Sequence, residues 1–154
     1  MNATVHASAV LAGARAVLIR GASGTGKSRL ARGLIQAART GSLPFARLVG
    51  DDRVYVEAAG ARLLVRPAPA LAGLIEVRGV GILRMPYEPV AVVSLVVDLG
   101  ADVERLPQPE HRQTKIEGIT LPRLAVAAAD PGLPAVLAVL TSPFGQFGGS
   151  QGLP

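Results

Sequence analysis

A glycine-rich stretch, GASGTGKS at residues 21–28, constrains the fold of this chain more than any other feature. A β-branched and aliphatic run precedes it at residues 14–21 and is typical of a buried strand. Directly after it, apolar residues recur at helical spacing over residues 27–39. A strand, a glycine loop and a helix in this order indicate an α/β domain that contains a parallel element.

The stretch matches G-x-x-x-x-G-K-[ST], the pattern of a loop that holds phosphate groups. Glycines let the backbone curl around a phosphate, and the N–H groups then point inward beside the positive end of the helix dipole. We expect Lys27 to bridge the β- and γ-phosphates of ATP and the Ser28 hydroxyl to bind Mg²⁺. The alternative is an ordinary turn between a strand and a helix. The residues expected to bind the nucleotide are Gly21, Ala22, Ser23, Gly24, Thr25, Gly26, Lys27, Ser28 and Arg29.

The composition fits one compact domain with an aliphatic core. The chain has 154 residues, of which 49% are hydrophobic and only 3% are aromatic, so the core must consist of Val, Leu, Ile and Ala. We expect the domain to occupy residues 1–142. Residues 143–154 are rich in Gly, Gln and Pro and are predicted to form a flexible C-terminal tail.

Charge and cysteine content exclude several kinds of protein. The net charge is +5, but the basic residues are scattered and do not alternate with aromatic residues, which argues against nucleic-acid binding. The absence of cysteine excludes disulfides, thiolate metal sites and a cysteine nucleophile. No apolar run reaches the roughly 18 residues that a membrane span needs, and the N-terminus has no signal-peptide pattern. We therefore expect a cytoplasmic protein that binds no membrane.

The rest of the chain has more strand than helix signals. Residues 46–67 predict a strand, a polar corner and a hairpin that turns at residues 59–60. Residues 90–100 are the most strand-like run, and residues 133–142 are predicted to form a final helix. Residues 116–129 fit either two strands or a strand and a short helix.

Acidic residues at three places are candidates for the second half of a nucleotide site. Asp51 and Asp52 follow an apolar run, and in such a pair one carboxylate can hold Mg²⁺ while the other takes a proton. A turn with two solvated acids gives the same pattern. Glu76 lies inside an apolar segment, where a carboxylate needs a metal or a partner such as Arg78. Asp98 lies at the end of an apolar run, a common position for a metal-binding acid in phosphate-loop proteins.

Three stretches together resemble the HPr kinase/phosphorylase family. They are HASAVLAGARAVLIRGASGTGKS, LVGDDRV and GLIEVRGVGIL, in that order. The third is the most specific, because the family signature is close to I-E-V-R-G-[LIV]-G-I and is matched here at Glu76, Val77, Arg78 and Gly79. The resemblance covers residues 4–100 and extends more weakly to about residue 140. It implies a P-loop catalytic domain related in fold to phosphoenolpyruvate carboxykinase, with a mixed central sheet and flanking helices.

The resemblance also implies a role for each matching residue. Asp51 corresponds to the base that takes the proton of a serine hydroxyl, and Asp52 to its neighbour near the metal and the phosphate. Glu76 corresponds to a metal-associated acid, and His6 to a histidine near the reacting phosphate, although a histidine near a chain terminus is often only solvated. The implied catalytic residues are Asp51, His6 and Lys27. The implied metal ligands are Ser28, Asp52 and Glu76.

Several features depart from the family pattern. The chain starts shortly before His6, so we expect the short form that consists of the catalytic domain only. Arg29 stands where the family usually has glutamate, which places a cation beside the phosphates. Residues 84–91 are too short for the flexible loop that long members use in substrate capture, so we expect weak or no phosphorylase activity. Asp98 falls where the family needs no acid, and we interpret it as a strand end.

The function implied by the resemblance is that of a serine kinase. It would use ATP and Mg²⁺ to phosphorylate an HPr-like phosphocarrier protein of the bacterial phosphotransferase system. Two alternatives stay open. One is a nucleotide-sensing module that regulates a sensor kinase or a phosphotransferase component without phosphoryl transfer, and the other is a kinase for a different hydroxyl substrate. Assembly into a homo-oligomer also stays open.

Overall fold

The computed structural model describes residues 4–142, so the predicted flexible tail at residues 143–154 lies outside the described residues. The strands are β1 (Thr4–Ala12), β2 (Arg15–Arg20), β3 (Ala46–Gly50), β4 (Arg53–Ala59), β5 (Arg62–Pro67), β6 (Leu74–Val77), β7 (Gly81–Arg84), β8 (Ala91–Leu99), β9 (Gln113–Ile116) and β10 (Ile119–Val126). The α-helices in this part of the chain are α1 (Lys27–Arg39) and α2 (Leu133–Leu140), and short 3₁₀ turns occupy Pro69–Leu71 and Pro109–Arg112.

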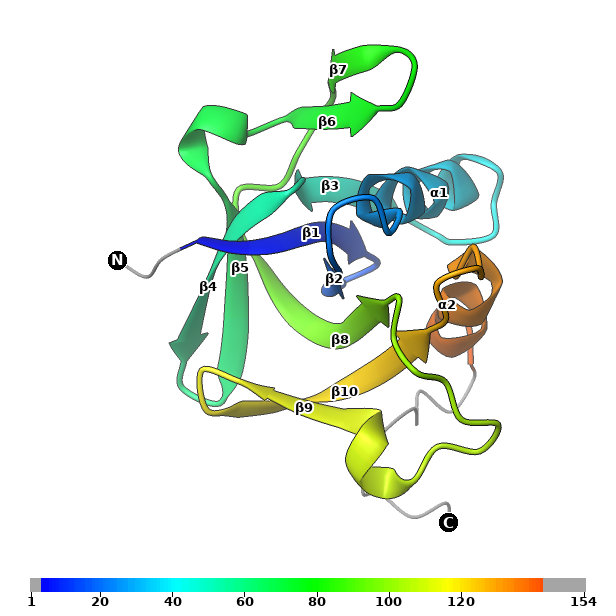
Figure 1. Ribbon diagram of the computed structural model, residues 1–154. Coiled ribbons are helices and arrows are strands. Elements are labelled where there is room, and N and C mark those ends of the chain that lie inside the picture. Colours follow the sequence, from blue (N-terminus) through cyan, green and yellow to red (C-terminus); the bar gives the residue numbers. More distant parts are fainter. Residues whose placement is uncertain (1–3, 143–154) are drawn as a thin grey trace.

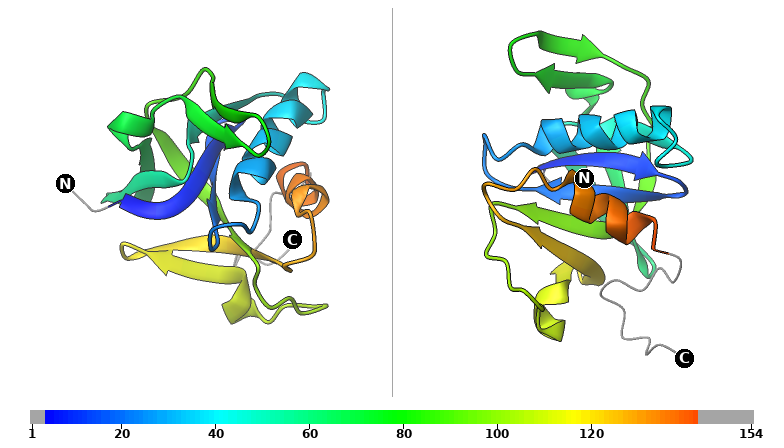
Figure 2. Two further views of the ribbon diagram at one scale, coloured as in Figure 1. Left: turned by 45° about the horizontal axis from the view of Figure 1, so that its top comes forward. Right: turned by 90° about the vertical axis from the view of Figure 1, so that its right-hand side faces the viewer.

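The main sheet is mixed and carries both α-helices side by side on one face (Figures 1 and 2). β2, β8 and β10 run parallel to one another, whereas the other pairings of this sheet are antiparallel. β1 pairs with β2, β4 pairs with β1 and β5, and β8 pairs with both β5 and β2, so these strands close a ring. The predicted α/β class with a mixed sheet and flanking helices is therefore confirmed.

Most of the predicted elements are present. The strand before the glycine loop is β2, and the helix after it has the predicted bounds, 27–39. The predicted hairpin is β4–β5, and the most strand-like run is β8. Residues 113–126 form the antiparallel pair β9–β10, so the alternative with a short helix is wrong for that part. The sequence reasoning assigned no strand to residues 4–12, yet β1 pairs with three other strands.

The core consists of aliphatic side chains, as the composition predicts. Every buried hydrophobic residue in the described part of the chain is Ala, Val, Leu or Ile. One cluster lies between the helices and the sheet, where Leu30 and Leu34 of α1 pack with Val17 and Ile19 of β2. A second cluster fills the inside of the curled sheet and includes Leu18. Burial of each large aliphatic side chain stabilises the fold by about 1.5–3 kcal/mol.

The hairpin β6–β7 forms a separate two-stranded sheet beside the main one (Figure 1). Its residues alternate between the two faces, as a strand dictates. Ile75 and Val77 are buried, with Ile75 belonging to the core cluster under α1, whereas Glu76 between them is exposed. Packing of Ile75 thus holds β6 against the helical layer, near the end of β3.

Among residues 4–142, no helix is both long and apolar enough to span a membrane.

Candidate functional site

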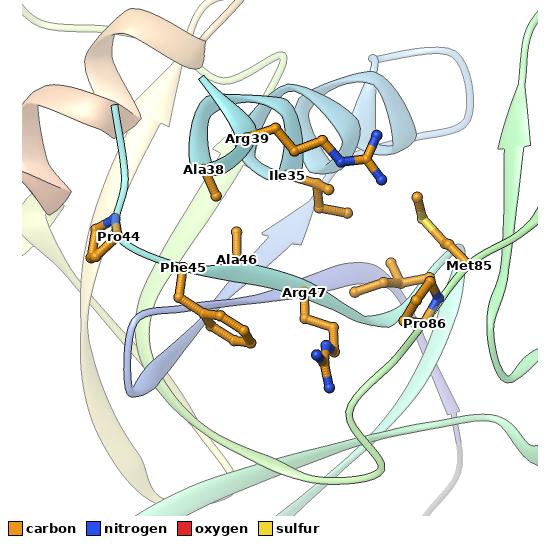
Figure 3. A pocket seen from close by; sticks show the side chains of 10 residues that line it. Ile35, Ala38, Arg39, Pro44, Phe45, Ala46, Arg47, Met85 and Pro86 are labelled. Carbon is orange, nitrogen blue, oxygen red and sulfur yellow. The ribbon is translucent and has the colours of Figure 1, made fainter. Parts of the chain in front are cut away.

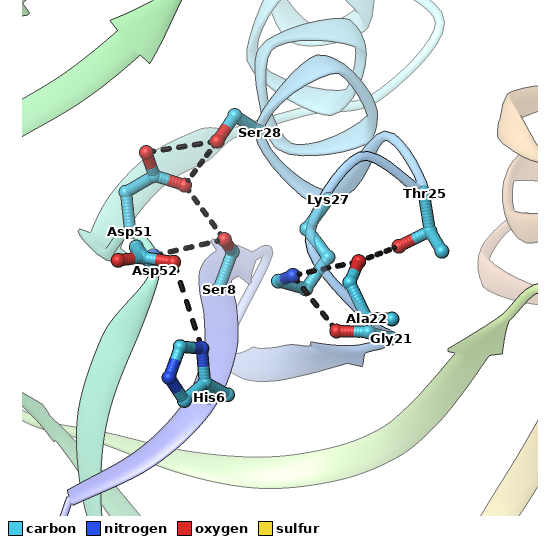
Figure 4. A network of polar contacts seen from close by, with 9 residues as sticks. All are labelled: His6, Ser8, Gly21, Ala22, Thr25, Lys27, Ser28, Asp51 and Asp52. Atoms are coloured by element: carbon cyan, nitrogen blue, oxygen red, sulfur yellow. Dashed lines mark hydrogen bonds and ion pairs between the residues drawn. The ribbon is translucent and has the colours of Figure 1, made fainter.

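The glycine loop, residues 21–26, joins the end of β2 to the start of α1 (Figure 4). Gly24 and Gly26 have φ angles of 84° and 98°, in the left-handed region that glycine tolerates best. Gly26 is the N-cap of α1, but no side chain caps the helix and no acidic residue lies in its first turn. The free N–H groups and the positive end of the helix dipole therefore favour an anion at this position.

The Lys27 side chain lies against the glycine loop rather than in solvent. Only 6% of the residue is exposed, and Nζ donates hydrogen bonds to the carbonyl oxygens of Gly21 at 2.8 Å and Ala22 at 3.2 Å. The Thr25 hydroxyl donates to the same Ala22 oxygen at 2.7 Å. The loop thus holds an ammonium group against its own carbonyl oxygens, and this cation is suited to a phosphate.

Asp51 lies directly after β3 and points toward the start of α1, with 4% of the residue exposed (Figure 4). The Ser8 hydroxyl donates to Oδ1 at 2.6 Å. The Ser28 hydroxyl lies 2.7 Å from Oδ1 and 2.9 Å from Oδ2, and the backbone N–H of Glu76 donates to Oδ2 at 3.1 Å. These donors come from β1, α1 and β6, so the carboxylate joins three elements that are far apart in the sequence.

The backbone around Asp51 directs the two neighbouring acids to different places. A Cβ at Gly50 would lie 2.7 Å from Val54 Cγ1 and 3.2 Å from Pro67 Cα, so only glycine fits at the end of β3. Asp52 has a φ of 68°, a left-handed conformation that Asp adopts more readily than most residues. Because of this turn, the Asp51 side chain is buried, whereas the Asp52 side chain is 56% exposed.

His6 lies on the exposed side of this turn. Its Nδ1 is 3.8 Å from Asp52 Oδ1, and its side chain is 53% exposed. The structure therefore brings His6 to Asp52 rather than to Asp51. Ser8, two residues further along β1, is fully buried and accepts a hydrogen bond from the Asp52 N–H at 3.2 Å.

Sequence reasoning missed Ser8. Its signal was the spacing of two residues from His6, since residues i and i+2 of a strand share a face. This spacing predicts that the two residues share a face only if residues 4–12 are first recognised as a strand.

The predicted signature contributes a backbone group to the site. The Glu76 side chain is exposed, and only its N–H reaches Asp51. Val77 is buried, Arg78 is exposed, and Gly79 has a φ of 80° in the turn that leads to β7. No ion pair between Glu76 and Arg78 is present in the described part of the chain, so that alternative is wrong.

The predicted metal ligands Ser28, Asp52 and Glu76 all adjoin Asp51, but only the Ser28 side chain points to it. The Ser28 hydroxyl bonds to Asp51, while the other two side chains are exposed. Within residues 4–142, no group of three or more His, Cys, Asp or Glu side chains is arranged to hold a metal ion. Arg29 is exposed and leans over the glycine loop, since a Cβ at Gly26 would lie 3.5 Å from a guanidinium nitrogen of Arg29. The assignment of these ligands stays a prediction.

Asp98 is the next-to-last residue of β8, as the strand-end interpretation predicts. Its carboxylate accepts hydrogen bonds from Arg20 Nε at 2.7 Å and from Arg123 Nε at 2.6 Å. Burial alone raises the pKa of Asp98, but the hydrogen bonds and charges of the two arginines outweigh it, so the pKa lies below the usual value. This acid links three parallel strands and has its charge fully compensated.

The sequence matches a family model described as HPr Serine kinase C-terminal domain over residues 1–132. The chain belongs to this family. It is 34% identical over 123 residues to the HPr kinase/phosphorylase of Limosilactobacillus reuteri, an alignment that covers 71% of this chain and 36% of that protein. The corresponding protein of Geobacillus thermodenitrificans is 36% identical over 123 residues, again covering 71% of this chain and 37% of the relative.

The fold of this family member also matches a solved structure. The HPr(Ser) kinase/phosphatase from Coxiella burnetii superposes with a TM-score of 0.71 at 25% sequence identity, covering 90% of this chain and 93% of that chain. The chain spans about a third of the length of the curated relatives it matches. The predicted resemblance to the HPr kinase/phosphorylase family is confirmed.

Proposed function

We propose that this chain is a protein-serine kinase that uses ATP and Mg²⁺ to phosphorylate an HPr-like phosphocarrier protein. The observation that carries the proposal is the buried Asp51 carboxylate, which is hydrogen-bonded to Ser28 in the first turn of α1. Asp51 lies at the uncapped start of α1, the same helix end that carries Lys27, and in this proposal it is the proton acceptor. Membership of the family supports the same assignment. The glycine loop then acts as a P-loop, in a domain of the phosphoenolpyruvate carboxykinase type.

The proposed reaction is an in-line transfer of the γ-phosphoryl group. The serine oxygen of the acceptor forms a bond to the γ-phosphorus, and the bond from that phosphorus to the β–γ bridging oxygen breaks. ADP leaves with the electron pair, and the Asp51 carboxylate accepts the serine proton. Lys27 and the N–H groups of the loop stabilise the charge on the phosphate oxygens.

The donors beside Asp51 fit a magnesium ion. Mg²⁺ prefers hydroxyl and carboxylate oxygens as ligands. The Ser28 hydroxyl bonds to Asp51, and the acids Asp52 and Glu76 adjoin Asp51, one as its chain neighbour and one through its N–H. Mg²⁺ supplies neutralisation of the phosphate charge. If the Ser28 hydroxyl turns to the ion, Asp51 keeps the donors from Ser8 and Glu76 and has lone pairs free for the serine proton. In this proposal Asp52 and Glu76 complete the metal environment, and His6 lies near the reacting phosphate.

The acceptor follows from the names of the relatives, which are HPr kinase/phosphorylases. In this proposal the kinase works in the cytoplasm within a bacterial phosphotransferase system. Only six residues separate β7 from β8, so the reverse, phosphorylase reaction is proposed to be weak or absent.

A transfer assay tests the proposal. Purified protein is mixed with γ-labelled ATP, Mg²⁺ and the HPr-like protein of the same organism, with a serine-to-alanine acceptor as control. We expect label on the wild-type acceptor only, and none with the Lys27→Ala enzyme. Transfer that survives Lys27→Ala would overturn the assignment of the glycine loop. Measurable ATP binding without transfer to this acceptor would favour the regulatory module or a kinase for a different hydroxyl.

A further inference from the structure

We propose that a cavity between the loops that follow β8 and β10 holds the base and ribose of the nucleotide. This inference rests on the proposed function, since it assumes that the phosphates of the same nucleotide lie on the glycine loop. The cavity has a volume of about 570 Å³, within the range of about 300–1,000 Å³ that is usual for small-molecule sites. Its walls are residues 102–111 on one side and residues 123–135 on the other.

The topology places this cavity at the same edge of the sheet as the glycine loop. β2, β8 and β10 are parallel neighbours, so their carboxyl ends lie at one edge of the sheet. The glycine loop follows β2, and the two walls of the cavity follow β8 and β10. In Figure 2, right, the loops that leave β2, β8 and β10 lie along the same edge. In α/β proteins, ligands commonly bind outside the carboxyl ends of parallel strands, and β2, β8 and β10 form the parallel part of this sheet.

Close packing joins the end of β8 to the glycine loop. A Cβ at Gly100 would lie 3.4 Å from Thr25 Cγ2, and a Cβ at Gly21 would lie 3.2 Å from Leu99 Cβ. Asp102, the first residue of the cavity wall, is two residues beyond Gly100. The cavity wall therefore begins only two residues after the point where the chain packs against the glycine loop.

The cavity offers polar groups of both kinds, which suits the hydroxyls and amino groups of a nucleoside. Its lining includes Asp102, Glu104, which pairs with His111, and Asp130, which accepts a hydrogen bond from the Gly132 N–H. The Arg123 guanidinium is already engaged, since Nε donates to Asp98 and Nη1 donates to the His111 carbonyl oxygen. Carboxylates repel phosphate but accept hydrogen bonds from ribose hydroxyls and amino groups of a base. At the glycine loop the opposite holds, because Lys27 and the free N–H groups attract anions.

The apolar part of the cavity lining fits the flat ring of a nucleotide base. Val103 is 52% exposed and lines the cavity together with Leu124 and Ala125. Arg105 also lines it and forms no ion pair within residues 4–142. A planar guanidinium stacks on aromatic faces, so Arg105 is suited to one side of a base. The apolar side chains of the cavity would contact the base, and its polar side chains would bind the ribose hydroxyls and the amino group of the base.

Another cavity, of about 290 Å³, lies between α1 and β3 (Figure 3). It includes Arg39 at the last turn of α1, whereas the glycine loop lies at the first turn. The 13 residues of α1 separate the two by about 20 Å at 1.5 Å per residue. Arg47 in this cavity already pairs with Glu88 and lies over the Phe45 ring. This hollow is too distant for the base of a nucleotide bound at the loop.

Calorimetry with two ligands tests the proposal. ATP and inorganic tripolyphosphate share a triphosphate, but only ATP carries a nucleoside. Ala135 lines the cavity on an exposed part of α2, so Ala135→Trp fills the cavity without disturbing the core. We expect this variant to lose at least about 10-fold in ATP affinity, equivalent to about 1.4 kcal/mol, and to bind tripolyphosphate like the wild type. Ala138 is exposed on the same helix and does not line the cavity, so Ala138→Trp is the matched control.

The outcomes separate this proposal from the proposed function. Unchanged ATP affinity in Ala135→Trp, or equal affinity of the wild type for both ligands, would overturn the nucleoside site while leaving the phosphate loop intact. A wild type that binds neither ligand would overturn both proposals. Because tripolyphosphate binding reports on the folded loop, a misfolded variant is recognised by losing both ligands.

Photolabelling of the unmodified chain gives a second, independent test. An ATP analogue with an azide on the base is bound in the dark and then illuminated, and the labelled peptides are mapped. We expect label within residues 102–111 or 123–135, suppressed by excess ATP. Suppressible label confined to other segments would place the base elsewhere and overturn the proposal.

Discussion

Asp51 and Asp98 both lie near the end of a strand and away from bulk solvent, but their carboxyl groups accept hydrogen bonds from different kinds of donor. Asp98 accepts hydrogen bonds from Arg20 and Arg123, so two cations compensate one anion. Asp51 accepts only from neutral donors, and no cationic side chain within residues 4–142 forms an ion pair with it. A buried carboxyl group without a cationic partner adds little to stability, which is why we assign Asp51 to the proposed reaction.

The comparison separates two tasks that look alike in the sequence. Asp98 holds the middle of three parallel strands together. Asp51 instead keeps lone pairs oriented toward the helix start by hydrogen bonds that do not neutralise it. The following predictions test this division of tasks, from the largest expected effect to the smallest.

Replacing Asp51 with asparagine is expected to have the largest effect. Asp51→Asn keeps the shape of the side chain but removes the proton acceptor, so the transfer rate should fall by at least about 10²-fold. Binding of ATP, measured by calorimetry, should change little. Loss of ATP binding in this variant would show that Asp51 is a structural or metal-binding residue and that the base lies elsewhere.

Replacing Ser8 with alanine should have a smaller effect on the same reaction. Ser8→Ala removes one donor from Asp51 and leaves the other hydrogen bonds in place, so we expect the rate to fall by about 10-fold. The measurement is kcat and the KM for ATP, of which only kcat should change. Ser8→Thr retains the hydroxyl and should restore the rate; equal rates for the alanine and threonine variants would contradict a positioning role.

Replacing Asp98 should affect stability and not transfer. Asp98→Asn leaves Arg20 and Arg123 partly buried without a counter-charge, which should lower the free energy of unfolding by about 1–3 kcal/mol. Urea unfolding at neutral pH measures this loss. The transfer rate per folded molecule should stay near the wild-type value. A large loss of the transfer rate in a folded Asp98→Asn protein would contradict the purely structural role assigned to Asp98.

The pH dependence of stability should give the smallest effect. Its direction tests the pairing of Asp98 with the two arginines. Because the pKa of folded Asp98 lies below its usual value, its ionised form stabilises the fold above the unfolded pKa, and this contribution is lost as the pH falls through the folded pKa. The difference in unfolding free energy between wild type and Asp98→Asn should therefore shrink from about pH 7 to about pH 2. A difference that grows on acidification would contradict the assigned pairing.

The local parts of the site were predictable from the sequence alone. The bounds of α1 and the position of the glycine loop depend on helical spacing and on glycines within a few residues of one another. The hairpin β4–β5 depends likewise on neighbouring residues. The aliphatic core follows from composition. These features need no knowledge of how distant segments meet.

The partners of the acids were decided by the tertiary structure. Ser8 reaches Asp51 across 43 residues, and Arg20 reaches Asp98 across 78. These contacts require the ring of strands to close, which no local pattern specifies. Glu76 is another case that the sequence could not settle. The sequence suggested that its carboxylate takes part in the site, but the backbone N–H of Glu76 is the group that bonds to Asp51. Burial of Ile75 and Val77 turned the Glu76 side chain outward, because side chains alternate along a strand. The sequence therefore determined the glycine loop, the helix that follows it and the candidate acids, while the packing of β1, β3 and β6 around α1 decided which of their atoms meet.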